Sequence, residues 1–356
     1  MDFLVARDDL HRCRFTEGDA PELEAGQARL RVDAFGLTSN NITYAKFGDA
    51  MSYWSFFPAE EGWGRVPVWG FAEVSESRRE GLEEGTRVYG YLPPSSELIV
   101  DATRVNERGF TDGAAHRARL PPAYNSYARR DADPIYDASH EDEQILLRPL
   151  FFTSYLIDDF LDESGLFGAG TVVLSSASSK TASALAFLLS RREGVDVVGL
   201  TSPRSAAFAR GLGVYDHVAS YEEIGELPRE RAVFVDMAGD AAVRDEVHRH
   251  YRDELAHSAV VGATHHDRMG ELPEDLPGPR PMFFFAPDRV GKRSADWGPA
   301  GLEQRLAEAW APYVQWTGTW LEVLHASGPE ALESAYLNLL DGRIDPSKAH
   351  VLSLNG

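Results

Sequence analysis

The chain has 356 residues and a formal net charge of −21, with 43% hydrophobic and 26% charged residues. This is the composition of a soluble globular protein that is long enough for two domains with separate cores. The acidic balance excludes the basic face that nucleic-acid binding needs. The chain also holds no run of about 18 apolar residues that would predict a membrane span.

The cysteine content and the N-terminal residues indicate the cellular compartment of the protein. A single cysteine, Cys13, excludes an intramolecular disulfide and a cysteine-rich zinc site. The first ten residues are charged too early and have too short an apolar core for a signal peptide. We therefore expect a cytoplasmic protein.

The first 110 residues predict short β-strands. Residues 28–34 alternate polar and apolar side chains, and residues 85–90 and 97–100 are short runs between turn residues. Residues 117–143 are polar and irregular, which predicts a long loop. A helix is expected over 146–161, with Pro149 near its start.

From residue 171 strands and helices alternate. The predicted strands are 171–174, 195–200, 232–236, 258–262 and 281–285, and the predicted helices are 182–189, 203–212 and 240–256. Further helices are expected at 300–315 and 329–341, before a last strand at 350–354. This alternation predicts an α/β fold with a doubly wound parallel sheet.

The turn after the first of these strands is the main candidate for cofactor binding. In the register of the dinucleotide fingerprint G-x-G-x-x-G it holds Ala177, Ser179 and Ala182, so small residues are kept and every glycine is lost. A helix N-terminus offers N–H groups and a positive dipole end to a phosphate. The hydroxyl and ammonium groups that could complete such a cradle belong to Ser176, Ser178, Ser179, Lys180 and Thr181. The alternative is that these residues only cap the helix.

The end of the next strand distinguishes the two nicotinamide cofactors. An NAD site places Asp or Glu there to accept from the ribose 2′-OH. This chain instead has Ser202 and Arg204, whose hydroxyl and guanidinium suit a 2′-phosphate. If a dinucleotide binds, we expect NADP(H); the alternative is that Arg204 is an ordinary surface residue.

Three passages resemble the medium-chain dehydrogenase/reductase superfamily on its zinc-free, quinone-oxidoreductase-like side. They are LTSNNITYAKFG at 37–48, EGTRVYG at 84–90 and FARGLGVYDHV at 208–218. More narrowly, the chain resembles a divergent branch catalogued as a domain of unknown function. The resemblance implies a β-rich, GroES-like catalytic domain over 1–150 and 326–356, a Rossmann domain over 151–325, and a cleft between them for nicotinamide and substrate. The sequence departs from the family pattern at Ile42, where the family has Asp, and at the lost glycines.

The resemblance also implies site residues. Tyr44 falls where zinc-free relatives place a tyrosine near nicotinamide and substrate, with Asn41 or Asn40 beside it. A phenol can protonate a developing enolate, and an amide can hold a carbonyl. The alternative is that Tyr44 packs under its helix and caps a backbone group. Weaker candidates in the family's pattern are Thr153 and Tyr155 at the cleft, and Tyr221 beside the 2′-phosphate.

Other clusters of polar or aromatic residues could have a binding role or only a structural one. His248 with His250, and residues 265–267 (HHD), are expected to be solvated rather than metal ligands. The aromatic residues between 51 and 69 suit an apolar pocket or a core. A predicted buried strand is followed by three cations, Arg289, Lys292 and Arg293. They could bind the cofactor or an anionic part of the substrate. The alternative is that they lie on the surface.

Together these observations predict a zinc-independent, NADPH-dependent oxidoreductase that reduces an enone, quinone or acyl-thioester-like substrate. The alternative is the same scaffold without redox activity, as a binding protein or as an enzyme of cofactor-free C–C or hydrolytic chemistry. Substrate identity, reaction direction and oligomeric state stay open, with a homodimer among the options.

Overall fold

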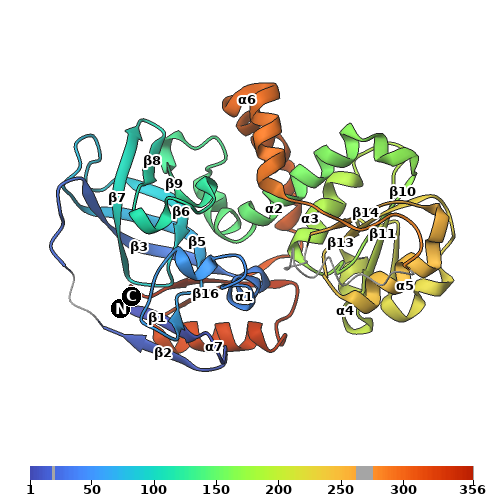
Figure 1. The fold of residues 1–356 in the computed structure, drawn as a ribbon, viewed down its shortest axis with the longest axis horizontal. Helices are drawn as coiled ribbons and strands as arrows, with labels where there is room; N and C mark the ends of the chain where they lie inside the picture. Colours follow the sequence, from blue (N-terminus) through green and yellow to red (C-terminus); the bar gives the residue numbers. More distant parts are fainter. Residues whose placement is uncertain (18–20, 262–275, 356) are drawn as a thin grey trace. The chain divides into compact units, whose positions relative to one another are not determined.

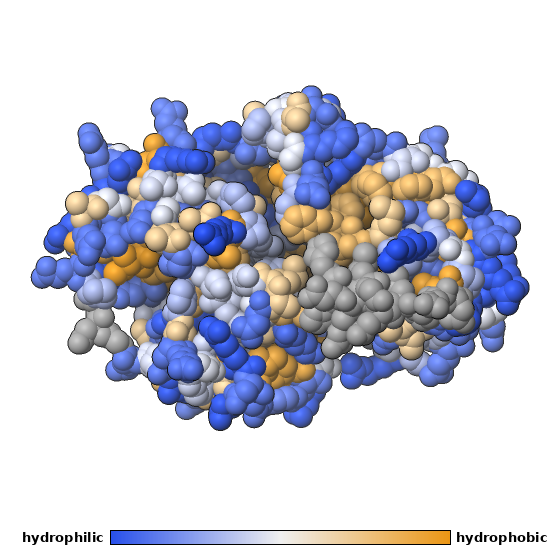
Figure 2. Space-filling model, in the orientation of Figure 1, coloured by the Kyte–Doolittle hydropathy of each residue, from blue (hydrophilic) through white to orange (hydrophobic). Residues whose placement is uncertain are grey.

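The computed structural model describes residues 1–17, 21–261 and 276–355. The chain forms two compact units, Met1–Arg148 with Leu321–Gly356 (unit 1) and Pro149–Trp320 (unit 2) (Figure 1). Hydrophilic side chains cover most of the face shown in Figure 2, which agrees with the net charge of −21. Within the described ranges, no helix has the length and apolar character needed to cross a membrane. The predicted α/β class, with a β-rich part and a parallel-sheet part, is confirmed.

Unit 1 is built around a closed β-barrel. Its strands are hydrogen-bonded in the order β3 (Gln27–Leu37), β5 (Val68–Ser77), β6 (Arg87–Leu92), β9 (Ser126–Arg129), β8 (Gly109–Asp112) and β7 (Glu97–Asn106), and β7 pairs with β3 to close the ring. In β3, Ala28, Leu30 and Val32 are buried and alternate with more exposed polar residues. This period of two is what a strand with one buried face requires.

Smaller elements surround the barrel. Strand β17 (Lys348–Ser353) pairs with β3, and β16 (Glu322–Ser327) pairs with β17. A second sheet has the order β2 (Cys13–Thr16), β1 (Asp2–Ala6), β4 (Trp63–Gly64), and the helices of the unit include α1 (Ser39–Lys46) and α7 (Pro329–Leu340). The indole of Trp54 lies so close to Gly48 and Gly64 that a Cβ would meet it at 2.0 and 2.4 Å, so both positions need glycine.

The predicted long loop at 117–143 is wrong in two places. It contains β9, which pairs with β6 and β8 and buries Tyr127, and it contains the first turn of helix α2 (Glu141–Glu163). A four-residue strand with one buried side chain leaves no periodic signal in the sequence. Since α2 begins at Glu141, Pro149 lies inside the helix and not near its start.

Unit 2 holds a six-stranded parallel sheet in the order β12 (His217–Ser220), β11 (Asp196–Thr201), β10 (Thr171–Leu174), β13 (Ala232–Asp236), β14 (Leu255–Val260) and β15 (Met282–Phe283). In chain order this is 3-2-1-4-5-6, the doubly wound dinucleotide-binding arrangement. The helices are α3 (Lys180–Leu189), α4 (Pro203–Gly211), α5 (Ala241–Tyr251) and α6 (Ala286–Thr317). Strands 171–174 and 232–236 match their predicted bounds, while β12 was not predicted as a strand.

Helix α6 is attached to α2 by a buried ion-pair network. Arg289 Nε and Arg293 Nε donate to the Asp159 carboxylate at 2.6 and 2.7 Å, and Arg289 also donates to Glu163. The arginine side chains are only 7% and 10% exposed. The alternative that Arg289 and Arg293 lie on the surface is therefore wrong, because both guanidinium groups are buried and paired with carboxylates. Lys292 is half exposed and pairs with Glu163 and Asp296.

The strand before these cations also differs from the prediction. We expected residues 282–285 to form a buried strand, but Met282 is 59% and Phe285 38% exposed. Only Met282 and Phe283 form a strand, β15, which lies at the edge of the sheet and has a neighbouring strand on one side only.

Removing the shared acceptor tests the network. Asp159→Ala leaves two buried guanidinium groups without their common carboxylate, so the free energy of unfolding should fall by about 3–5 kcal/mol. The matched control Asp162→Ala removes a carboxylate that is 63% exposed and pairs with Arg192, and should cost less than about 1 kcal/mol. Urea denaturation of both variants measures the difference; equal losses would contradict the assignment.

Candidate functional site

The turn between β10 and α3 has a strained entry. Ser176 adopts the left-handed region with φ of 55°, where non-glycine residues are uncommon. Its N–H donates to the Tyr221 hydroxyl at 3.1 Å. Tyr221 begins the short 3₁₀ helix that follows β12, so this bond joins the carboxyl ends of two strands. Two residues predicted separately from the sequence therefore lie together.

Ser179 is the N-cap of α3. Its Oγ accepts from the Ala182 N–H at 3.2 Å, as the capping alternative expected. Capping uses the hydroxyl as an acceptor, and its own hydrogen stays available to a phosphate oxygen. Capping and phosphate binding by Ser179 are therefore compatible. Lys180 and Thr181 are the first two residues of the helix, both half-buried.

The first lost glycine is compensated on the neighbouring strand. Ala177 is fully buried; its N–H donates to the Leu200 carbonyl at 2.9 Å, and its own carbonyl accepts from Tyr215 at 2.8 Å. A Cβ on Gly199 of β11 would lie 2.8 Å from the Ala177 methyl. The space that a turn glycine usually leaves is thus provided by Gly199. A lone Gly inside a strand pattern, which can mark a close approach, was the available signal.

A buried carboxylate holds the other side of the turn. Asp236, at the end of β13, is 0% exposed and accepts from Ser175 Oγ at 2.9 Å, the Gly239 N–H at 3.0 Å and Arg244 Nη1 at 3.1 Å. Ser175 Oγ in turn accepts from the Ala238 N–H at 2.9 Å. Burial raises the pKa of Asp236, and the bonds from Ser175, Gly239 and Arg244 oppose that shift. Sequence reasoning missed this network because Ser175 and Asp236 are 61 residues apart along the chain.

The end of β11 contributes hydroxyls and a cation. Thr201 donates to Ser178 Oγ at 3.3 Å, which ties this strand end to the turn. Ser202 is the N-cap residue of α4, and its hydroxyl bonds to Ser205 at 3.3 Å. Arg204 is exposed in the first turn of α4. The predicted residues of this half of the site therefore gather at the carboxyl edge of β10, β11 and β12.

Helix α2 supplies a contact that the sequence did not indicate. Ser154 is fully buried and donates to the carbonyl of Thr181 at 2.8 Å, so α2 contacts the start of α3. Its predicted neighbour Thr153 donates instead to the Pro149 carbonyl one turn earlier, at 3.1 Å. Tyr155 is half-buried, and burial raises its pKa to about 12.

In unit 1, Asn41 is committed to the backbone. Its Oδ1 accepts from the Thr38 N–H at 2.7 Å in a capping box, and its Nδ2 donates to the Pro67 carbonyl at 2.8 Å. These bonds fix the start of α1 against the strand that follows Pro67. Asn40, rather than Asn41, is the asparagine side chain whose polarity lowers the pKa of the Tyr44 phenol, against the larger effect of burial.

Tyr44 lies in a cluster of buried phenols. Its hydroxyl accepts from Trp69 Nε1 at 3.4 Å, and its ring lies 4.5 Å from Tyr53 and 5.7 Å from Tyr91 between centroids. Tyr124 packs against Tyr91 at 4.8 Å. Burial raises the pKa of all four tyrosines. Each phenol therefore stays protonated near neutral pH and is a hydrogen-bond or proton donor, not a base.

Two histidines that the sequence singled out are buried. His248 and His250 are 0% and 3% exposed, which corrects the prediction that they are solvated. His248 bonds to the Pro277 carbonyl and the Ser258 hydroxyl, and His250 to the Leu227 carbonyl. Burial lowers the pKa of both. Residues 265–267 lie outside the described residues, and within the described ones no three His, Cys, Asp or Glu side chains gather as a metal site.

A family model described as "Protein of unknown function (DUF2855)" matches residues 35–345. No curated protein sequence matches the chain. Among solved structures, CurA from Vibrio vulnificus is 16% identical over 99% of this chain and 96% of its own, with a TM-score of 0.61. CurA in complex with NADPH is 18% identical over 97% and 94%, with a TM-score of 0.58. YhdH of E. coli K-12 with bound NADPH is 15% identical over 100% of both chains, with a TM-score of 0.57. At these identities the likeness shows a shared fold.

Ser175→Ala tests the buried network at Asp236. The variant removes a donor to the carboxylate and leaves the Ala238 N–H unpaired, so we expect a loss of about 1–3 kcal/mol. It also raises the pKa of Asp236 further. A raised carboxyl pKa costs stability as pH rises through it, so the deficit should be larger at pH 8 than at pH 4.

Thermal unfolding at both pH values measures this effect. The control is Ser190→Ala, an exposed serine at the end of α3 that should change stability little. A deficit independent of pH would mean that Asp236 is not the group affected.

Proposed function

Because the chain belongs to the DUF2855 family and shares its fold with two structures that contain NADPH, we propose that it is a zinc-independent oxidoreductase using NADP(H). Its substrate is an enone, a quinone or an acyl-thioester-like compound. The observation that carries the proposal is the hydroxyl-lined turn after β10, with Ser202 and Arg204 at the end of the adjacent strand.

The residues present fit the pyrophosphate of a dinucleotide. Helix α3 starts at the point where the strand order of the sheet reverses, which is where such folds bind nucleotides. The Ala177 methyl is buried toward Gly199 and does not occupy the approach to the turn. The N–H, hydroxyl and ammonium groups that would bind the phosphates come from Ser176, Ser178, Ser179, Lys180 and Thr181.

The adenosine end of the cofactor sets the preference for NADPH. Ser202 and Arg204 stand where an NAD site carries a carboxylate, and a guanidinium pairs well with phosphate oxygens. Tyr221 begins the segment after β12, and its hydroxyl already accepts from the Ser176 N–H. We assign the 2′-phosphate to Ser202 and Arg204, with Tyr221 at its side.

When bound, NADPH supplies a hydride. We assign Tyr44 as the proton donor to the substrate, because its buried phenol is held protonated and accepts a hydrogen bond from Trp69. Asn41 is better assigned as the residue that anchors α1, since its amide is bonded to Thr38 and Pro67. We assign Thr153, the neighbour of Ser154 on α2, to the cofactor site.

Cofactor titration tests the proposal directly. We expect nicotinamide fluorescence to report saturable NADPH binding, with NADH much weaker. Arg204→Ala should weaken NADPH by about 10–100-fold, the value of a charge-assisted hydrogen bond, and leave NADH unchanged. The control Arg229→Ala removes an exposed arginine shortly before β13, at the opposite edge of the sheet.

Each outcome of the titration has a meaning. No binding of either nucleotide at millimolar concentration would overturn the proposal and favour the scaffold without redox activity. Equal loss of both nucleotides in Arg204→Ala would contradict the assignment of the 2′-phosphate.

Tyr44→Phe tests the proton donor. With NADPH and 2-cyclohexen-1-one or 1,4-benzoquinone as substrate, kcat should fall by about 10²–10⁴ while the Kd for NADPH is unchanged. Because burial raises the Tyr44 pKa, the wild-type rate should show no alkaline limb from this phenol below pH 9. Tyr127→Phe, another buried phenol of the same unit, is the folding control. A Tyr44→Phe variant with normal kcat would show that the phenol only packs.

A further inference from the structure

Two phenols that flank strand β12 both bond to the glycine-free turn after β10. Tyr215 precedes β12 and donates to the Ala177 carbonyl at 2.8 Å. Tyr221 follows β12 and accepts from the Ser176 N–H at 3.1 Å. Two consecutive residues of the turn are therefore each bonded to a side chain, and neither phenol belongs to the glycine fingerprint of such folds.

Tyr215 is itself held in place by the sheet. The Asp216 N–H donates to the Val197 carbonyl at 2.9 Å, and the Val197 N–H donates to the Asp216 carboxylate at 2.8 Å, which ties this segment to β11. The Tyr215 ring packs on a buried cluster that includes Ala177. A Cβ on Gly199 would meet this ring at 2.8 Å, so the glycine makes room for the ring as well as for the Ala177 methyl. Burial raises the pKa of Tyr215, so its hydroxyl stays a donor at any physiological pH.

Ser176 has the backbone conformation that makes the turn sensitive. Its φ of 55° lies in the left-handed region, which costs a serine free energy that a glycine does not lose. Ala177, at the first glycine position of the fingerprint, does not have a positive φ. The strained residue thus lies one position before the fingerprint register, and its N–H is the group that bonds to Tyr221. The Tyr221 ring packs against a second buried cluster, which includes Val173 of β10.

We propose that Tyr215 and Tyr221 are positioning residues for phosphate binding, which hold this turn in the conformation that glycines permit in other dinucleotide-binding folds. The inference rests on the proposed function, because it concerns the same turn. Tyr215 fixes the Ala177 carbonyl, and Tyr221 keeps Ser176 left-handed. Loss of either bond lets the turn leave this conformation, so NADPH and NADH should lose affinity together.

Two conservative variants test the positioning role. Tyr215→Phe and Tyr221→Phe keep each ring and remove its hydroxyl. Nicotinamide fluorescence on the full chain should show that the Kd of NADPH and the Kd of NADH both rise by about five- to tenfold, the value of one hydrogen bond. A contact with the 2′-phosphate alone would weaken only NADPH. The matched control Tyr251→Phe removes a buried phenol of α5 in the same unit and should leave both Kd values unchanged.

A glycine at position 176 should rescue the loss of Tyr221. Ser176→Gly removes the cost of a left-handed serine, so Tyr221→Phe in this background should weaken both nucleotides by about twofold at most. The same coupling can be measured without any nucleotide. The fall in Tm caused by Tyr221→Phe should be smaller in the Ser176→Gly background than in the wild type.

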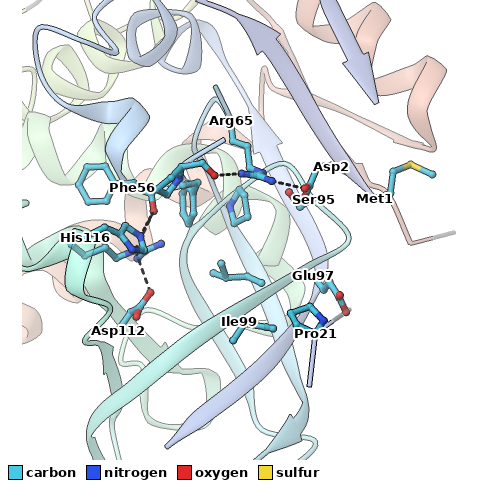
Figure 3. A pocket seen from close by; sticks show the side chains of 15 residues that line it. Met1, Asp2, Pro21, Phe56, Arg65, Ser95, Glu97, Ile99, Asp112 and His116 are labelled. Atoms are coloured by element: carbon cyan, nitrogen blue, oxygen red, sulfur yellow. Dashed lines mark hydrogen bonds and ion pairs between the residues drawn. The ribbon is translucent and has the colours of Figure 1, made fainter. Parts of the chain in front are cut away.

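The pocket in unit 1 serves as a control for nucleotide binding elsewhere on the chain. Its volume is about 280 Å³, and none of the residues assigned to the turn lines it. In Figure 3, Ile99 stands between Asp112 and His116 on one side and Glu97 and Pro21 on the other. Ile99→Trp fills this pocket and should leave the Kd of both nucleotides unchanged. Loss of binding in this variant would place the nucleotide in unit 1 and overturn the proposal.

The remaining outcomes separate this inference from the proposed function. Equal effects of Tyr221→Phe in the two backgrounds, in affinity and in Tm, would overturn the positioning role of Tyr221. Unchanged Kd values in Tyr215→Phe would do the same for Tyr215. A wild-type protein that binds neither nucleotide would contradict the proposed function, and the coupling in Tm would then decide alone whether Tyr221 holds the turn.

Discussion

A wholly buried carboxylate at the reversal point of the parallel sheet is the constraint on which the candidate site depends. Asp236 lies at the end of β13 and bonds to Ser175 at the end of β10, the adjacent strand. Arg244 and the Gly239 N–H offset the cost of burying its charge. The turn that begins at Ser175 is therefore held by side chains from both strands, and its conformation does not rest on glycine alone.

The loss of the fingerprint glycines is consistent with this arrangement. A glycine in such a turn provides space and conformational freedom, and here the two are supplied by different residues. Space comes from Gly199 on β11, which receives the Ala177 methyl. The left-handed conformation at Ser176 is held by its bond to Tyr221. Serine and threonine residues then occupy the turn in which the usual fingerprint has glycines.

Burial raises the pKa of acidic groups in both units, but the chemical consequence differs between a carboxylate and a phenol. In unit 2 it raises the pKa of Asp236, and the neighbouring donors limit that cost. In unit 1 it raises the pKa of Tyr44 and its neighbours and so keeps each phenol as a donor. The same desolvation that makes a charge expensive makes a neutral proton donor persistent. Tyr44 gains its chemistry from a phenol with few hydrogen-bond partners in an apolar surrounding.

The sequence by itself determined the strand–turn–helix order, the bounds of β10 and β13, the missing glycines and the serine and arginine at the end of β11. These are local properties, set by side-chain periodicity and by turn chemistry within a few residues. Only the tertiary structure decided that Asn41 caps α1, that β9 joins the barrel between β6 and β8, and that Arg289 and Arg293 pair with Asp159. The burial of His248 and His250 and the role of Asp236 belong to the same group. In each case the outcome depends on a partner that is distant along the chain, and no local pattern encodes which side chain will meet it.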